Sequence, residues 1–220
     1  MATNLALDDR LIEAAKLAGK HRTKREAVTA ALDEYVARRK QQAIFELDGA
    51  IDYEPSLDLA ALRGKPRRKK GRAQQVAEVI VLVDTTIWSL ALRRRTATRS
   101  AVDTRLLDEW STLVRKRRAV LIGPIRQELL SGIRDASQFA VLRGHLGAFA
   151  NVPIEDEDYV VAAELFNRCR SHGVSAASVD MLISAVAHRV EVFVFTTDVD
   201  FAHYGPHTAV RPHRPRVVAR

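Results

Sequence analysis

Residues 79–88 read Val79-Ile80-Val81-Leu82-Val83-Asp84-Thr85-Thr86-Ile87-Trp88, and this run sets the architecture of the chain. Its first five residues are wholly apolar and mostly β-branched, which is typical of a strand buried on both faces of a parallel sheet. The strand ends in a carboxylate and two hydroxyls. Ligands of open α/β sheets bind at the carboxyl ends of the strands, so Asp84 is a candidate site residue. The alternative is that Asp84 only caps the helix that follows.

The composition indicates a soluble globular protein with an excess of positive charge. The chain has 220 residues, 47% of them hydrophobic and 28% charged, and a net charge of +8. This length allows one large domain or two small ones. The basic residues concentrate in 65–72, 93–99 and 115–118. A polyanionic partner is therefore expected, either nucleic acid or an anionic membrane.

The cysteine content and the N-terminus favour a cytoplasmic location. Cys169 is the single cysteine, so no intrachain disulfide can form, as is usual in a reducing compartment. The N-terminus has acidic residues by Asp8 and does not resemble a signal peptide. No apolar run reaches the roughly 20 residues that span a bilayer.

The first 42 residues predict a strand followed by two helices. Residues 2–7 read as a short strand, and Asp8 or Asp9 then caps a helix that ends at Gly19. A second helix opens at Thr23, with capping-box spacing to Glu26, and runs to about residue 42. A lone strand and two short helices cannot bury a sufficient core. Pairing with the same strand of a second copy would solve this, so we expect at least a homodimer.

This region resembles the ribbon-helix-helix antitoxins of the VapB type. The resemblance rests on residues 3–9 with Leu11 and Ile12, and on the segment Thr23-Lys24-Arg25-Glu26-Ala27-Val28 with Ala31-Leu32. It implies that the paired ribbon enters the major groove of operator DNA through Asn4. It also implies that the start of the second helix holds a phosphate, with Lys24 or Arg25 suited to that contact. The chain departs from the family by having Ala2 and Ala6 beside Asn4, where a basic residue is usual near position 2.

Residues 43–64 are less periodic, with apolar anchors in an acidic context, which suits a segment that wraps a partner. They resemble the toxin-wrapping tail of VapB antitoxins in Gly49-Ala50-Ile51-Asp52-Tyr53 and Asp58-Leu59. In that family a basic side chain from the tail can enter the toxin's acidic pocket, and Arg63 is the candidate here. Residues 65–78 read as a basic, flexible linker.

From residue 79 to residue 220, strands alternate with helices, which indicates an α/β domain with a parallel-type sheet. The strands expected after the first are 119–122 and 191–196. The expected helices are 102–117, one from Gly123, 139–149, 156–171, and one capped by Ser178. His203 and His207 are interpreted as loop residues.

Four acidic residues have matching local settings in this domain. Asp84 and Asp198 each follow a buried strand, and Glu128 and Asp180 are expected near the starts of helices. We expect all four to converge on one crevice. Clustered carboxylates repel one another, and a hard divalent cation such as Mg²⁺ or Mn²⁺ removes that penalty. Taken singly, each acid is more often a cap or a surface group, but the four together in these settings are much less easily explained that way.

The same domain resembles the PIN-domain ribonucleases of the VapC toxin type. The matching motifs are Val83-Asp84-Thr85-Thr86-Ile87-Trp88, Glu128-Leu129-Leu130-Ser131-Gly132, Asp180-Met181-Leu182-Ile183-Ser184-Ala185 and Thr196-Thr197-Asp198-Val199-Asp200-Phe201. The resemblance implies an acidic catalytic site of Asp84, Glu128, Asp180 and Asp198, with Asp84 and Asp180 as metal ligands. Thr86, Thr197 and Asp200 would support it. The basic clusters at 93–99 and 115–118 are candidates for RNA phosphate contact, or simply solvated faces.

The sequence thus predicts a fusion of antitoxin and toxin, natural or artificial, with a Mg²⁺- or Mn²⁺-dependent endoribonuclease held inactive by its own antitoxin segment. The expected units are 1–42, 43–64, 65–78 and 79–220. The alternative is a non-catalytic DNA-binding repressor in which the PIN-like part serves only assembly. An aspartyl phosphatase is disfavoured, because such enzymes need a second aspartate where this chain has Thr86.

Overall fold

A computed structural model describes residues 7–53, 80–93 and 99–215. Its centre is a three-stranded parallel sheet of β1 (Val81–Val83), β2 (Ala119–Val120) and β3 (Phe193–Phe195), in the order β2-β1-β3. Leu82 of β1 lies opposite Val120 on one side and Val194 on the other. All three residues of β1 are fully buried. The prediction of a strand covered on both faces is confirmed for Val81–Val83, whereas Ile80 of the predicted run lies outside the strand and is 49% exposed.

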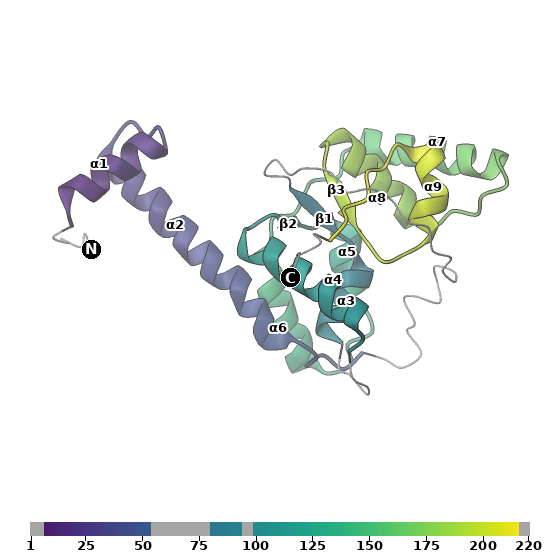
Figure 1. Cartoon of the computed structure of the whole chain (residues 1–220), viewed down its shortest axis with the longest axis horizontal. Coiled ribbons are helices and arrows are strands. Elements are labelled where there is room, and N and C mark those ends of the chain that lie inside the picture. Colours follow the sequence, from purple (N-terminus) through teal and green to yellow (C-terminus); the bar gives the residue numbers. More distant parts are fainter. Residues whose placement is uncertain (1–6, 54–79, 94–98, 216–220) are drawn as a thin grey trace.

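Helices cover the sheet in two groups, as Figure 1 shows. The first group is α3 (Thr85–Leu92), α4 (Ala101–Arg115), α5 (Gly123–Leu130) and α6 (Ala136–Leu146). The second is α7 (Asp156–Ser171), α8 (Ser178–Arg189) and α9 (Asp200–Thr208). The first group is centred on Trp88, whose ring packs edge-on against Trp110 and Phe149 with centroids 5.4 and 4.9 Å apart. The predicted α/β architecture is confirmed.

The helix boundaries follow local capping chemistry. Helix α1 (Asp9–Ala18) is capped by Asp8, which accepts a 2.8 Å hydrogen bond from the N–H of Arg10. Helix α2 (Lys24–Gln42) opens with the predicted capping box, in which Thr23 and Glu26 satisfy each other's backbone N–H. Both predicted helices are confirmed. The ribbon strand predicted over 2–7, with Asn4, lies outside the described residues except for Leu7.

The antitoxin-like region is joined to the α/β domain by α2 and the segment after it. Helix α1 and the start of α2 project away from the α/β domain, and the end of α2 packs beside α4 and α6 (Figure 1). There the side-chain amide of Gln41 donates a 2.9 Å hydrogen bond to the carbonyl of Ala148. The chain then forms a short 3₁₀ helix, Ala43–Leu47.

Residues 43–53 are part of the core of the α/β domain. Ile44 and Ile51 are buried, and the ring of Phe45 packs edge-on against Trp110 at 5.3 Å. Isolated β-bridges join Ile51 to Arg93 and Tyr53 to Ile133. The first part of the predicted wrapping tail is thus inserted in the domain that it was expected to wrap. The rest of the tail, with Arg63, and the linker over 65–78 lie outside the described residues.

The C-terminal part of the domain departs from the sequence prediction. His203 and His207 lie in helix α9 and not in a loop. Gly205 and Pro206 conceal this helix in the sequence, but Phe201, Tyr204 and Thr208 recur on one face and are buried. In the described part of the chain, no helix combines the length and apolar composition needed to cross a membrane.

Candidate active site

Asp84 lies at the carboxyl end of the central strand, where β1 passes into α3. It occupies the N-cap position of α3, yet its side chain makes no capping hydrogen bond. Instead, its Oδ2 accepts hydrogen bonds from the hydroxyls of Thr86 at 2.9 Å and Thr196 at 2.8 Å. The carboxylate is fully buried. The interpretation of Asp84 as a simple helix cap is therefore wrong, because its side chain is oriented toward the loop after β3.

Thr196 is the residue of this group that the sequence interpretation missed. Its hydroxyl lies 3.2 Å from that of Thr86 and accepts a 2.9 Å hydrogen bond from the N–H of Asp198. Thr197, which was predicted to support the site, contributes its backbone N–H to the Thr86 hydroxyl at 3.2 Å. The signal for Thr196 was its position directly after a buried strand, the same position that singled out Asp84.

Asp198 and Asp200 shape the turn that leads into α9. Oδ1 of Asp198 accepts a 2.9 Å hydrogen bond from the N–H of Asp200. Asp200 is the first residue of α9, and its Oδ1 lies 3.6 Å from Nδ1 of His203. The carboxylate of Asp198 therefore stabilises the turn, whereas the carboxylate of Asp200 lies near His203 of the same helix.

Glu128 does not lie where the sequence suggested. It lies in the last turn of α5 and not near the start of a helix, because this helix has only eight residues. Its Oε2 accepts a 2.5 Å hydrogen bond from the hydroxyl of Thr85, the residue after Asp84. The prediction about its helix position was wrong. The prediction that Glu128 belongs near Asp84 agrees with this hydrogen bond.

Asp180 lies in the first turn of α8, as predicted, and is fully buried. Its Oδ2 accepts a 3.3 Å hydrogen bond from the hydroxyl of Tyr204 on α9. Burial, and then the negative charge of Asp180, raise the pKa of Tyr204 above its ordinary value. Tyr204 therefore stays protonated and donates to Asp180. The sequence interpretation missed Tyr204 because it did not predict α9.

Hydrogen bonds connect three of the acids, Asp84, Glu128 and Asp198, at the carboxyl end of β1, whereas Asp180 is bonded to α9. Hydroxyls of Thr85 and Thr196 join Glu128 and Asp198 to the Asp84 turn, and Tyr204 joins Asp180 to α9. Within residues 7–53, 80–93 and 99–215, no group of three or more His, Cys, Asp or Glu could hold a metal ion. Mg²⁺, however, usually takes one or two carboxylates and completes its shell with waters and substrate phosphates. Two carboxylates, whose donor atoms are all oxygens, therefore suit such an ion.

The residues predicted to contact nucleic acid lie in different surroundings, and their contacts with nucleic acid stay predictions. Lys24 forms ion pairs with Asp9 at 2.9 Å and Glu13 at 3.5 Å, and Arg25 is exposed. Of the two basic clusters, Arg93 stacks over the ring of Tyr53 and Arg115 over that of Phe45. Both arginines thus contact the segment 43–53, and Arg115 remains exposed to solvent.

Two family models match the chain. One, described as the VapB bacterial antitoxin of type II toxin–antitoxin systems, matches residues 1–47, and the other, the PIN domain, matches residues 81–205. No curated protein matches the chain.

Several solved structures are similar. The crystal structure of FitAcB from Neisseria gonorrhoeae is 20% identical with a TM-score of 0.49, over 62% of this chain and 98% of that one. FitAB bound to an IR36 DNA fragment is 18% identical with a TM-score of 0.46, over 64% and 99%. DNA-bound VapBC from Salmonella typhimurium is 12% identical with a TM-score of 0.46, over 61% and 97%.

Proposed function

Since the chain belongs to the PIN-domain family and begins with a VapB antitoxin domain, we propose that it is a toxin–antitoxin fusion whose second domain is a metal-dependent endoribonuclease. The observation that carries this proposal is the environment of Asp84. Its buried carboxylate is oriented by two hydroxyls, from Thr86 and Thr196, at the end of the central strand. The proposed site of action is the cytoplasm, and the proposed units are 1–42, 43–64, 65–78 and 79–220.

In this proposal Asp84 and Asp180 hold a Mg²⁺ or Mn²⁺ ion, and Glu128 and Asp198 complete the catalytic site. A bound ion of this kind supplies an activated water and neutralises charge on the phosphate during phosphodiester hydrolysis. Thr86 and Thr196 fix the orientation of the Asp84 carboxylate, and Tyr204 does the same for Asp180. Thr197 and Asp200 shape the adjoining turn through their backbone N–H groups.

The antitoxin part inhibits the nuclease from within the same chain. Support comes from the first part of the tail, since Ile44, Ile51 and Tyr53 are buried in the core of the PIN domain. The described part of the tail therefore ends in contact with the domain, and Arg63 is the proposed inhibitory side chain. A short tether gives an effective concentration in the millimolar range, so the inhibited state dominates in the intact chain.

The N-terminal region is proposed to form a dimer, or a higher oligomer, that binds operator DNA. Its helices expose a set of large apolar side chains that a second copy can cover. These side chains are Leu11, Leu17, Leu32, Tyr35 and Val36. Asn4 is the proposed base contact, and Lys24 and Arg25 at the start of α2 are the proposed phosphate contacts.

A second candidate is a non-catalytic repressor in which the PIN domain serves assembly. The observation that favours it is the same packing of residues 43–53, because it makes the antitoxin segment and the PIN domain one structural unit. Cleavage of RNA distinguishes the two candidates, since DNA binding is common to both.

The test uses the full chain with a site-specific protease site placed within 65–78. Cutting there leaves Ile51 and Tyr53 in place, whereas a fragment that begins at residue 79 loses part of the core. The cut protein is incubated with single-stranded RNA and Mg²⁺ or Mn²⁺, or with EDTA. We expect cleavage only with the metal, and faster after the cut than before. Intact RNA under all conditions, with the fold retained, refutes the nuclease proposal.

A further inference from the structure

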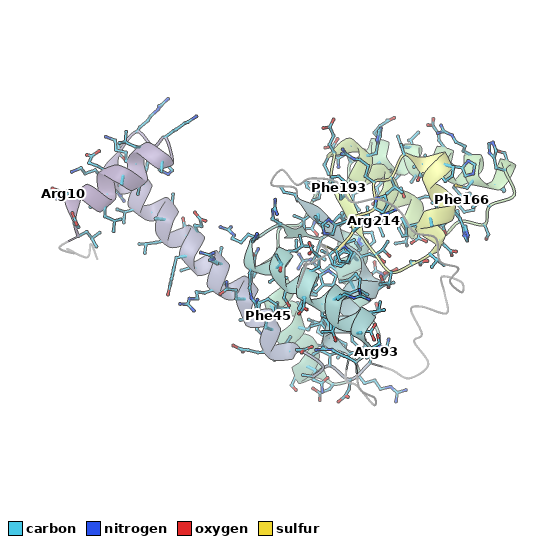
Figure 2. All side chains as sticks on the ribbon, viewed as in Figure 1. Arg10, Phe45, Arg93, Phe166, Phe193 and Arg214 are labelled. Carbon is cyan, nitrogen blue, oxygen red and sulfur yellow. The ribbon has the colours of Figure 1, made fainter. Side chains whose placement is uncertain are left out.

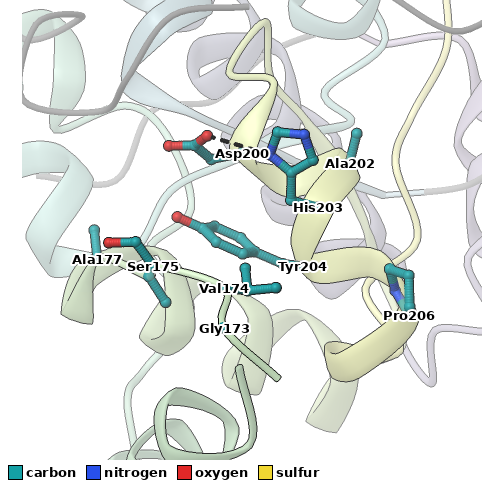
Figure 3. Close-up of a pocket in the computed structure, with 10 residues that line it drawn as sticks. Gly173, Val174, Ser175, Ala177, Asp200, Ala202, His203, Tyr204 and Pro206 are labelled. Atoms are coloured by element: carbon teal, nitrogen blue, oxygen red, sulfur yellow. Dashed lines mark ion pairs between the residues drawn. The ribbon is translucent and has the colours of Figure 1, made fainter. Parts of the chain in front are cut away.

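A pocket of about 870 Å³ lies between the loop that precedes α8 and the first turns of α9. Residues 173–177 line it on one side, and Asp200, His203 and Tyr204 on the other (Figure 3). The volume is in the range of pockets that hold small organic ligands. Tyr204, which lines the pocket, is itself buried. Figure 2 shows this part of the molecule on the side of α7 and α9, well away from α1.

Two residues of the pocket wall are hydrogen-bonded to two of the candidate catalytic acids. The hydroxyl of Tyr204 donates to Asp180 at 3.3 Å, and the N–H of Asp200 donates to Asp198 at 2.9 Å. The pocket therefore adjoins the proposed active site through the side chain of Tyr204 and the backbone N–H of Asp200. A group that binds in it lies close to a phosphate held at the acids.

The chemistry of the wall disfavours a phosphate as the occupant. Among the described residues that line the pocket there is no lysine or arginine, and the charged side chain is the carboxylate of Asp200. This side chain is 24% exposed, so it can accept hydrogen bonds from a ligand. A carboxylate repels phosphate but accepts from N–H donors.

The side chain of His203 adds a flat aromatic surface. It is 57% exposed, and its Nδ1 lies 3.6 Å from Oδ1 of Asp200 (Figure 3). Unstacked RNA bases are commonly recognised by stacking on histidine or another aromatic ring, together with hydrogen bonds to their Watson–Crick edge. Asp200 and His203 supply these two contacts side by side, on successive turns of one helix.

We propose that this pocket binds one unpaired base of the RNA substrate and that it selects guanine. Guanine is the RNA base with two adjacent N–H donors on its Watson–Crick edge, N1–H and the N2 amine, which match the two oxygens of the Asp200 carboxylate. His203 stacks on the base. This inference rests on the proposed ribonuclease function, and it makes a guanine beside the scissile phosphate the preferred sequence context.

The test measures binding in the absence of divalent metal, so that it does not depend on cleavage. Fluorescein-labelled uridine decamers carry a central guanosine, inosine or uridine, and the linker-cut chain is titrated into each while anisotropy is recorded. Inosine lacks the N2 amine but keeps the ring. We expect the guanosine decamer to bind about tenfold more tightly than the other two.

Two variants and one control assign the effect to the pocket. Asp200→Asn removes the preference for guanosine over inosine, because an amide offers one acceptor in place of two. His203→Ala weakens the binding of the guanosine decamer by about tenfold, the lower range for loss of one stacked base. His188→Ala replaces an exposed histidine of α8 outside the pocket and leaves all three affinities unchanged.

Equal affinities for guanosine and inosine, absence of binding, or an unchanged preference in Asp200→Asn overturns the proposal. Free guanosine monophosphate that binds as tightly as the decamer assigns the pocket to a free nucleotide and overturns the RNA assignment. Selective binding without cleavage by the linker-cut chain refutes the nuclease and leaves the pocket. RNA cleavage at sites unrelated to guanine, at a rate that His203→Ala does not change, supports the nuclease and refutes the guanine pocket.

Discussion

The hydroxyl of Thr196, the first residue after β3, donates a 2.8 Å hydrogen bond to the carboxylate of Asp84 at the end of β1. The two residues are 112 positions apart in the chain. The contact exists because β1 and β3 are neighbouring parallel strands, whose carboxyl ends meet at the same edge of the sheet. It fixes the orientation of the Asp84 carboxylate, which is proposed to bind the metal ion.

Removal of this hydroxyl is expected to impair the nuclease more than the fold. Thr196→Val should lower the cleavage rate of the linker-cut chain by roughly 10- to 100-fold, as is common when a residue that orients a metal ligand is lost. It should also raise the Mn²⁺ concentration needed for half-maximal activity. Thr196→Ser, which keeps the hydroxyl, should restore both.

The matched control is Thr112→Val, since that hydroxyl bonds only to the carbonyl of Asp108 in its own helix. If Thr196→Val needs no more metal than the control does, then Thr196 does not position Asp84 for metal binding.

The insertion of residues 43–53 in the PIN core predicts a large stability cost at Ile51. This side chain is 1% exposed. Ile51→Ala should lower the free energy of unfolding by about 2–4 kcal/mol, because it removes apolar contacts and leaves a cavity. Urea denaturation followed by circular dichroism measures this. Ile80→Ala, at a site 49% exposed, should cost less than about 1 kcal/mol. Equal effects at the two sites would mean that the antitoxin segment is not part of the core in solution.

A buried ion pair predicts how stability depends on pH. Asp158, whose side chain is 3% exposed, accepts two 2.8 Å hydrogen bonds from Arg189. The Arg189 hydrogen bonds hold the pKa of Asp158 below its ordinary value. The pair therefore contributes fully above the unfolded pKa of about 3.9, and the contribution is lost as the pH falls through the lowered folded value.

Asp158→Asn should accordingly lower the free energy of unfolding by about 2–3 kcal/mol at pH 7. This is less than for a fully enclosed pair, because the side chain of Arg189 is 28% exposed. The difference from wild type should shrink as the pH is lowered below 4. Asp156→Asn, an exposed site in the same first turn, serves as the control. A difference that stays constant from pH 7 to pH 3 would show that the charge of Asp158 is not what stabilises the fold.

The sequence predicted those elements whose determinants are local. The apolar run before Asp84 indicated the central strand, and the Thr23–Glu26 capping box located the start of α2 to the residue. Glu128 was placed at the wrong end of its helix, although Gly132, which takes a positive φ two residues after the last residue of α5, is a stop signal in the sequence.

Contacts between distant residues were beyond sequence reasoning. The hydrogen bond from Tyr204 to Asp180 depends on how α9 packs on α8, and Gly205 with Pro206 disguised α9 as a loop. The burial of Ile44 and Ile51 was equally hidden, since spaced apolar residues fit a wrapping segment and a core segment alike. The acids were recognisable by their positions after strands and in motifs, but not the hydroxyls that orient them.

The most direct test of the account compares the RNA cleavage rates of Asp84→Asn and Asp108→Asn in the linker-cut chain with Mn²⁺. Asp108 is an exposed acid of α4, so both variants remove one carboxylate from the same domain. The account predicts that Asp84→Asn abolishes cleavage, with a rate at least about 100-fold lower, while Asp108→Asn cleaves as fast as wild type. A folded Asp84→Asn variant that cleaves RNA as fast as wild type would contradict this prediction.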